Sequence, residues 1–147
     1  MESINRETKN GFYTFHDIIP EIQKLRQTTF ITEQNVPAEI EFEENEDRYI
    51  HCGYFSNGFL IATARLKISN DSAKMGRVAV GNEFRNRGFG RKIVMYAEKE
   101  AKRLGAKSVY IDAQIQAKGF YEKLGYLPLG EQFTEADIPH IKMYKTV

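Results

Sequence analysis

The chain has 147 residues, of which 41% are hydrophobic and 28% are charged, and its formal net charge is +1. This composition is typical of a globular domain, and the near-zero net charge argues against nucleic acid as a partner. No apolar run approaches the ~18 residues that a membrane-spanning helix needs, so we expect no membrane contact and one cytoplasmic domain over residues 1–147.

Cysteine and histidine are too sparse in the sequence to predict a metal centre. Cys52 is the only cysteine, which excludes an intrachain disulfide, and the three histidines are scattered along the chain. We therefore expect no bound metal. Cys52 is expected to be a buried strand residue and not a nucleophile.

The first part of the chain predicts one strand and one helix. The strand covers residues 11–15. Asp17 is expected to cap a helix that has Pro20 in its first turn and ends near residues 35–37. The segment 39–47 is so acidic that we expect an exposed loop or a short helix there.

The next part of the chain predicts an antiparallel meander. Two strands, at residues 50–55 and 59–68, flank Ser56-Asn57-Gly58, which is a strong hairpin signal. A turn at residues 70–72 then leads into a third strand at 74–80.

A long helix comes next, and strands alternate with a short helix after it. Apolar residues recur every three or four positions from Phe89 to Leu104, the spacing of one helix face, and Gly105 is expected to end the helix. The remaining predicted elements are a strand, a short helix and two strands, at residues 108–113, 117–124, 126–133 and 141–146. This order predicts an α+β fold in which helices cover the faces of a mixed sheet.

Two glycines, Gly88 and Gly90, stand where the long helix begins. The start of a helix carries unpaired N–H groups and partial positive charge, and glycines let a ligand approach closely, so this loop suits an anionic diphosphate. Arg85, Arg87 and Arg91 add positive charge. The loop lacks both the Lys-Ser/Thr pair of a P-loop and the third glycine of a Rossmann fingerprint, which argues against a nucleotide-binding protein.

The spacing Arg85-x-x-Gly88-x-Gly90, between a strand and a helix, resembles the acyl-CoA pyrophosphate loop of the GNAT superfamily of N-acyltransferases. The order of elements matches the GNAT fold along essentially the whole chain, which implies a mostly antiparallel sheet of about seven strands with about four helices. The resemblance also implies acetyl-CoA as co-substrate. The residues that it assigns to acetyl-CoA are Val78, Ala79, Val80, Arg85, Arg87, Gly88, Phe89, Gly90, Arg91 and Phe120.

Two further segments resemble GNAT proteins and carry the candidate catalytic residues. The segment 117–126 resembles the closing motif of the superfamily and implies that the Tyr121 hydroxyl reaches the thioester sulfur. The segment 139–145 resembles the branch that includes the ElaA/YjcF-like acyltransferases and glyphosate N-acetyltransferase, which implies that His140 is the general base. An amine attacks only when neutral, and an imidazole can accept its proton near neutral pH.

The acceptor site is predicted less directly. Arg77 matches an arginine that contacts the acidic substrate in the glyphosate-acetylating relatives, and with Arg65 and Arg26 it could form a basic pocket for a carboxylate or phosphate. Those relatives have a further arginine where this chain has Gln114, so the same substrate is not implied. A segment containing Glu33 and Gln34 resembles the ElaA-like side of the branch, and these two residues are expected either to line the acceptor pocket or to cap the first helix.

Together these features predict an acetyl-CoA-dependent N-acetyltransferase that acts on the primary or secondary amine of a small molecule in a ternary complex. A backbone N–H near Ala79 or Val80 is expected to stabilise the oxyanion. Two alternatives remain open: an acetyltransferase for a protein or peptide amine, and a non-catalytic module that binds acyl-CoA. The C-terminal strands are candidate sheet edges, so a homodimer is a further expectation.

Overall fold

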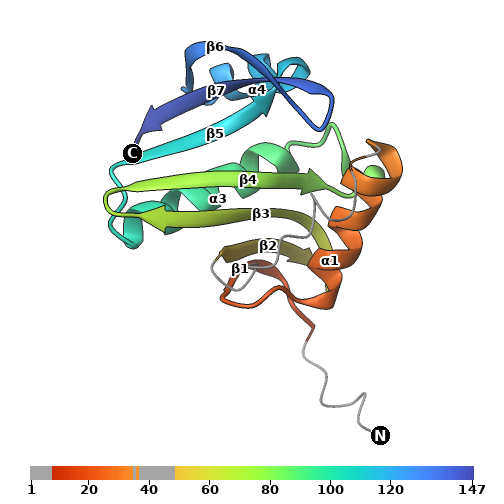
Figure 1. The fold of residues 1–147 in the computed structure, drawn as a ribbon. Coiled ribbons are helices and arrows are strands. Elements are labelled where there is room, and N and C mark those ends of the chain that lie inside the picture. The colour runs from red at the N-terminus through yellow and green to blue at the C-terminus, as the bar shows by residue number, and fades with distance from the viewer. Residues whose placement is uncertain (1–7, 35, 37–48) are drawn as a thin grey trace, which may run out of the picture.

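A computed structural model describes residues 8–34, 36 and 49–147, and the acidic segment 39–47 lies outside these residues. The strands form one seven-stranded sheet in the order β1-β2-β3-β4-β5-β7-β6 (Figure 1). Among the strand pairs of the described residues, only β4–β5 is parallel, so the predicted mixed and mostly antiparallel sheet is confirmed. The strands are β1 Gly11–Phe15, β2 Ile50–Ser56, β3 Phe59–Ser69, β4 Ser72–Val80, β5 Ser108–Gln114, β6 Leu127–Glu135 and β7 Ile138–Thr146.

The helices lie on opposite faces of this sheet. Helix α3 packs behind β2 to β5, and α1 lies across the ends of β3 and β4 on the other face (Figure 1). The described residues include three α-helices, with a π-helix and short 3-10 turns beside them. Their bounds are α1 Pro20–Arg26, π-helix η2 Gln27–Glu33, η4 Asn82–Phe84, α3 Phe89–Arg103, η5 Ile115–Ala117 and α4 Lys118–Lys123.

The start of the first helix differs from the prediction that Asp17 caps it. Ile19 is the N-cap, no side chain bonds there, and Pro20 is the first helical residue. Because proline has no N–H to satisfy and its φ angle suits a helix, it begins the helix without a polar cap. The helix then widens into η2 after Arg26, where one continuous α-helix was expected.

The core lies between the sheet and α3. The predicted apolar face of this helix is confirmed, because Ile93, Ala97 and Ala101 are fully buried. They pack against buried residues of the central strands such as Leu66 and Val109. Full burial of an Ile, Leu or Val side chain contributes about 1.5–3 kcal/mol to folding, so the core fixes α3 firmly against the sheet.

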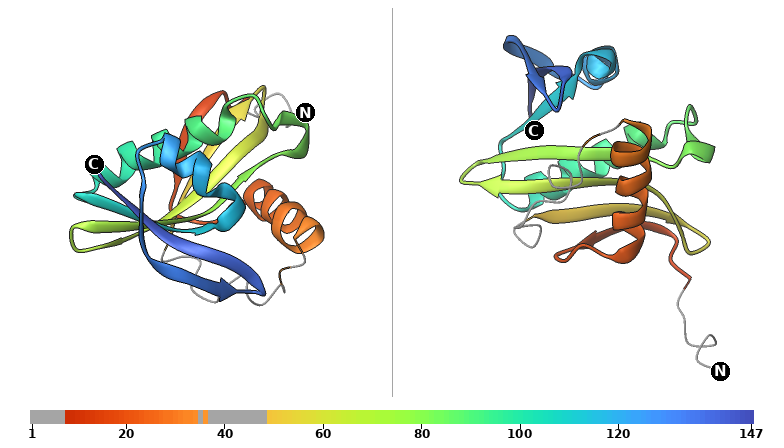
Figure 2. Two further views of the ribbon diagram at one scale, coloured as in Figure 1. Left: turned by 90° about the horizontal axis from the view of Figure 1, so that it is seen from above. Right: turned by 45° about the vertical axis from the view of Figure 1, so that its right-hand side comes forward.

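The sheet opens between β4 and β5. These two strands pair only as far as Met75 and Ile111. Beyond that point β4 continues along β3, while β5 continues along β7 to Gln114. Figure 2 shows the consequence, since β6, β7 and α4 stand away from the part built on β1 to β4.

A β-bulge in β4 lies at the start of this opening. The β3–β4 register shifts between Thr63 and Arg65, and Arg77 in the bulge has a φ of 51°. A non-glycine residue in the left-handed region costs about 1–3 kcal/mol, and such bulges commonly re-aim side chains beside active sites. The bulge therefore places Arg77 at the opened edge of β4.

Candidate functional site

Two cavities adjoin at the opening between β4 and β5. The strand cavity, about 350 Å³, is lined by β4, β5 and β7 and by the end of η2. The loop cavity, about 720 Å³, is lined by the end of β4, by the start of α3 and by α4. Residues common to both walls are Gln34, Val78, Ala117 and Tyr121. Molecules bound in the two cavities would therefore meet at these residues.

The start of α3 forms one wall of the loop cavity. Gly88 is the N-cap in the left-handed conformation, with a φ of 86°, which glycine adopts without strain. The first hydrogen bond of the helix runs from the Lys92 N–H to the Gly88 carbonyl. The N–H groups of residues 89–91 come before this bond, so they have no carbonyl partner within the helix. These groups make the loop cavity suited to an anion.

Gly90 lets α3 and α4 approach each other. A Cβ atom at Gly90 would lie 3.3 Å from Cζ of Phe120 and 3.7 Å from Cγ2 of Val80. The missing side chain therefore allows the Phe120 ring of α4 to lie close to the start of α3.

The end of β4 presents backbone groups to the opening. The Gly81 N–H donates to the Ile61 carbonyl of β3 at 2.8 Å. Because N–H groups alternate in direction along a strand, the N–H of Val80 points away from β3, toward the opening. The Val80 carbonyl lies on the same side and accepts a bond from Arg85 Nε at 3.1 Å.

Tyr121 lies on α4 where the cavities adjoin. Its side chain is buried, with its ring edge-on to Phe120 and Tyr126 at centroid distances of 4.9 and 5.6 Å. Burial raises the pKa of the Tyr121 hydroxyl. The hydroxyl consequently stays protonated and can act as a proton donor.

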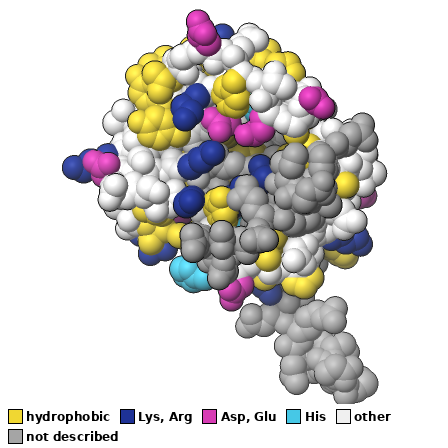
Figure 3. Space-filling view, in the orientation of Figure 1, with side chains coloured by type: hydrophobic (Ala, Val, Ile, Leu, Met, Phe, Trp, Pro, Cys, Tyr) yellow, Lys and Arg dark blue, Asp and Glu magenta, His cyan; other side chains and the backbone are white. Residues whose placement is uncertain are grey.

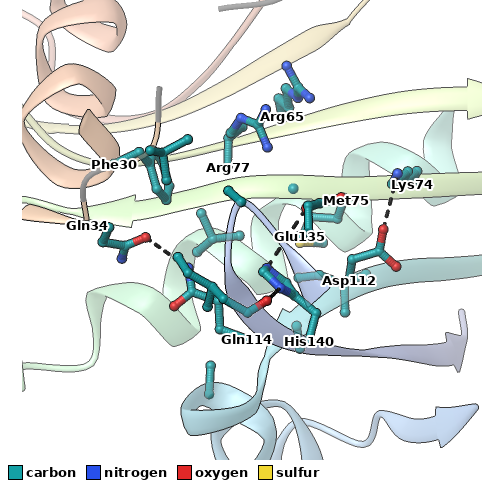
Figure 4. Close-up of a pocket in the computed structure, with 18 of the residues that line it drawn as sticks. Phe30, Gln34, Arg65, Lys74, Met75, Arg77, Asp112, Gln114, Glu135 and His140 are labelled. Carbon is teal, nitrogen blue, oxygen red and sulfur yellow. Dashed lines mark hydrogen bonds and ion pairs between the residues drawn. The ribbon is translucent and has the colours of Figure 1, made fainter. Parts of the chain in front are cut away.

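His140 lies in β7 on the wall of the strand cavity and is 6% exposed. Its Nδ1 atom is 2.7 Å from the Ile138 carbonyl, and a carbonyl only accepts, so Nδ1 carries the proton. In the neutral ring Nε2 is then the basic atom, 3.9 Å from Glu135 Oε2 (Figure 4). The Phe133 ring stacks on the imidazole at 5.7 Å and holds its plane.

The strand cavity has charges of both signs on its walls. Figure 3 shows basic and acidic side chains next to one another on this face. Lys74 Nζ pairs with Asp112 at 3.3 Å, and the guanidinium of Arg65 stacks on the Tyr49 ring at 3.8 Å. The labelled side chains of Figure 4 place Arg65 and Arg77 together, opposite Glu135 and His140.

Comparisons with known proteins identify the family of this chain. A family model described as an acetyltransferase (GNAT) domain matches residues 6–147. The chain belongs to the GNAT acetyltransferase family. This match confirms the resemblance of the sequence to the GNAT superfamily.

Individual relatives place the chain more closely within the GNAT family. It is 36% identical to the uncharacterized N-acetyltransferase YjcF of Bacillus subtilis, over 82% of this chain and 87% of that protein. It is 31% identical to the protein ElaA of Escherichia coli, over 84% of each. The crystal structure of Escherichia coli ElaA superposes with a TM-score of 0.81, over 93% of this chain and 99% of that one.

More distant solved structures share the fold. An aminoglycoside 6'-N-acetyltransferase complexed with coenzyme A has a TM-score of 0.73 at 18% identity, with 92% of this chain and 96% of that chain covered. It shows that the GNAT fold of this chain is also the fold of a protein that binds coenzyme A.

Most residues that the GNAT resemblance assigned to acetyl-CoA line the loop cavity, and Phe120 is among them. Arg87 is the exception, because it is exposed and lines neither cavity. Arg85 lines the loop cavity, but its guanidinium is directed at Glu33.

The residues assigned to the acceptor divide between several places. Arg65, Arg77 and Gln114 line the strand cavity, whereas Glu33 lines the loop cavity. Arg26 is 1% exposed and lines neither.

Two features of the structure bear on the alternative roles predicted for Gln34. It is the C-cap of η2, and it lines both cavities. Its Oε1 accepts a bond from Gln114 Nε2 at 2.8 Å, which ties the end of η2 to the end of β5 (Figure 4).

Sequence reasoning did not assign Tyr49, Lys74, Asp112 or Glu135 to the site. All four line the strand cavity. Side chains alternate between the two faces of a sheet along each strand. This alternation could have placed Lys74 of β4 and Asp112 of β5 on the same face. Their pairing depends on the β4–β5 register, which local patterns do not carry.

Several other expectations concern groups outside the cavities. Cys52 is fully buried in β2, as predicted, and burial, with a smaller effect of the Glu100 carboxylate, raises the pKa of its thiol to about 12. Within the described residues, no group of three or more acidic, histidine or cysteine side chains could hold a metal ion. None of the described helices has the length and apolar character to cross a membrane.

Proposed function

We propose that this protein is an acetyl-CoA-dependent N-acetyltransferase that acetylates the primary or secondary amine of a small molecule. The observation that carries the proposal is the meeting of two cavities at Tyr121, Val78 and Gln34. Direct transfer needs the thioester and the amine in contact, and holding both reactants in place removes much of the entropic barrier.

Acetyl-CoA is the donor that suits the loop cavity. The N–H groups of residues 89–91 and the side chain of Arg91 would bind the diphosphate. The pantetheine arm would lie along Val78–Val80 and bring the thioester to Tyr121. The coenzyme A held by the aminoglycoside 6'-N-acetyltransferase of the same fold supports this choice.

Residues on the walls of the two cavities suggest a reaction by direct attack. The amine would pass its proton to Nε2 of His140 and form a C–N bond with the thioester carbonyl carbon. The Val80 N–H, directed at the opening, would stabilise the oxyanion of the tetrahedral intermediate. Collapse would break the C–S bond, and Tyr121 would donate its proton to the thiolate sulfur.

The strand cavity favours a small acceptor that also carries an anionic group. Arg65 and Arg77 would bind a carboxylate or phosphate, and Glu135 would attract the amine toward His140. A volume of about 350 Å³ is in the range of small-molecule sites. An amino-acid-like acceptor or an acidic amino sugar therefore fits better than a peptide segment.

An acceptor screen tests this proposal. Free thiol released from acetyl-CoA is measured with amino acids, amino phosphonates, amino sugars and matched amines that lack the acidic group. We expect release only with an amine present, and faster release with an acidic one. Stabilisation by CoA without amine-dependent release would instead favour a non-catalytic acyl-CoA-binding module.

A further inference from the structure

Glu33 and Arg85 form a two-pronged ion pair across the loop cavity. Arg85 Nη2 donates to Glu33 Oε1 at 2.7 Å, and Nη1 donates to Oε2 at 3.2 Å. Glu33 is the last residue of η2, and Arg85 follows η4 in the loop that leads to α3. The pair thus joins two walls of the cavity that are 52 residues apart in sequence.

The third contact of Arg85 is with the backbone of β4. Its Nε donates to the Val80 carbonyl, so all three guanidinium nitrogens donate to groups within the protein. The peptide that follows Val80 is bonded on both sides, because the Gly81 N–H donates to Ile61. Glu33 therefore acts on the end of β4 through Arg85.

The charges of the pair also argue against Arg85 as a diphosphate ligand. A free carboxylate in the wall of an anion site would repel the anion, whereas here Glu33 is neutralised by Arg85. The guanidinium charge of Arg85 is compensated in turn. The N–H groups of residues 89–91 and the Arg91 side chain remain to bind a diphosphate.

We propose that Glu33 is a positioning residue for acetyl-CoA binding: it holds Arg85 on the Val80 carbonyl and so fixes the strand end along which the pantetheine arm lies. This inference rests on the proposed function. It gives Arg85 a role in shaping the site, where the GNAT resemblance implied that Arg85 binds acetyl-CoA.

The two roles of Arg85 predict opposite effects of Glu33→Gln. If Glu33 positions Arg85, the loss of the ion pair weakens CoA binding and raises KM for acetyl-CoA by about two- to fivefold, with kcat unchanged. If Arg85 is a diphosphate ligand restrained by Glu33, the same change frees its charge and tightens CoA binding. Glu83→Gln, an exposed change of the same charge on the same loop, is the matched control and should alter neither constant.

An acetyl donor that lacks the diphosphate gives a second test of whether Arg85 positions β4 or binds the diphosphate. S-acetylpantetheine has the thioester and amides of acetyl-CoA but no phosphate. We expect Glu33→Gln and Arg85→Gln to raise KM for both donors by similar factors, and the double variant to be no worse than Arg85→Gln alone. An Arg85→Gln defect confined to acetyl-CoA, or tighter CoA binding by Glu33→Gln, would overturn the proposal.

Amide hydrogen exchange without ligand distinguishes failure of this inference from failure of the proposed function. Either single substitution should accelerate exchange in residues 81–87 while leaving the melting temperature and the exchange of β3 unchanged. Unchanged exchange in 81–87 would overturn the positioning role. A wild-type protein that binds no CoA would contradict the proposed function, and the exchange result would still decide whether Glu33 orders the loop.

Discussion

At the scale of single residues, Tyr121 combines burial with a position on both cavity walls. Burial raises the pKa of its hydroxyl, so it can donate a proton but not accept one near neutral pH. We expect Tyr121→Phe to lower kcat by about 10²-fold or more, with CoA affinity nearly unchanged. Steady-state kinetics and calorimetric titration with CoA measure these quantities. Tyr110→Phe, outside both cavities, is the control, and an unchanged kcat would remove Tyr121 from the chemistry.

A second prediction at the level of single residues concerns His140 as the general base. Its Nδ1–H bond to the Ile138 carbonyl leaves Nε2 as the basic atom. We expect His140→Ala to lower kcat/KM for the amine by about 10²- to 10⁴-fold. Steady-state kinetics at one pH, with saturating acetyl-CoA and the amine varied, measure this ratio. An unchanged ratio would shift the base role to a water chain or a carboxylate.

Cys52 provides a pH-dependent prediction that is independent of catalysis. Burial raises the pKa of its thiol from 9.0 to about 12 in the folded chain, so the unfolded chain loses this proton first. The thiol's contribution to stability is therefore complete below pH 9 and is lost as the pH rises toward 12. At pH 10 we expect wild type to lose on the order of 1 kcal/mol more of its unfolding free energy than Cys52→Ala does. Urea unfolding of both proteins at pH 7 and pH 10 measures the difference, and equal losses would contradict the prediction.

At the scale of elements, the contact of α3 with α4 depends on Gly90. A methyl group there would press on the Phe120 ring at 3.3 Å, and overpacking of this kind costs about 1–3 kcal/mol. We expect Gly90→Ala to lower the melting temperature and to reduce its rise on addition of CoA. Gly119→Ala is the matched control in α4, because its Cβ meets no atom within 4 Å. An equal rise in melting temperature on addition of CoA in the two variants would contradict this prediction, because it would show that the Phe120 ring moves aside without loss of CoA binding.

The π-helix η2 also acts at the scale of elements. It places Glu33 on the loop cavity and Phe30 on the strand cavity, while Gln34 reaches both. Departures from α-helical geometry toward a π-helix often accompany functional sites. One segment of the chain therefore contributes to the walls of both cavities.

At the scale of the whole molecule, a polar link joins α3 to the last strands behind the opening. The Tyr126 hydroxyl donates to Glu98 at 2.7 Å, and Lys145 Nζ donates to the same carboxylate at 3.0 Å. Hydrogen bonds to a charged group contribute about 1.5–3 kcal/mol, so we expect Tyr126→Phe to lower the unfolding free energy by that order. Urea unfolding at pH 7 measures the change. Tyr144→Phe, at a partly buried tyrosine of β7, is the control, and equal effects would mean that the Glu98 bond adds nothing.

The two halves of the sheet differ in how well sequence patterns predicted them. Strand 11–15, the hairpin about Asn57 and the α3 helix were predicted nearly to the residue, because turn chemistry and apolar period are local properties. Strand β7 begins at Ile138, three residues before its predicted start. His140 is therefore held within a strand, paired in register with Gln114 of β5.

The sequence by itself determined the family, the order of elements and the glycine-rich start of α3, since each of these follows from residues close together in the chain. It also identified Tyr121 and His140 as the candidates for catalysis. Only the tertiary structure decided that Glu33 meets Arg85, that Gln34 meets Gln114, and that Glu135 lies beside His140. The reason is physical: these contacts depend on strand register, on the end of β4–β5 pairing and on the angle of η2, which only the packed fold sets.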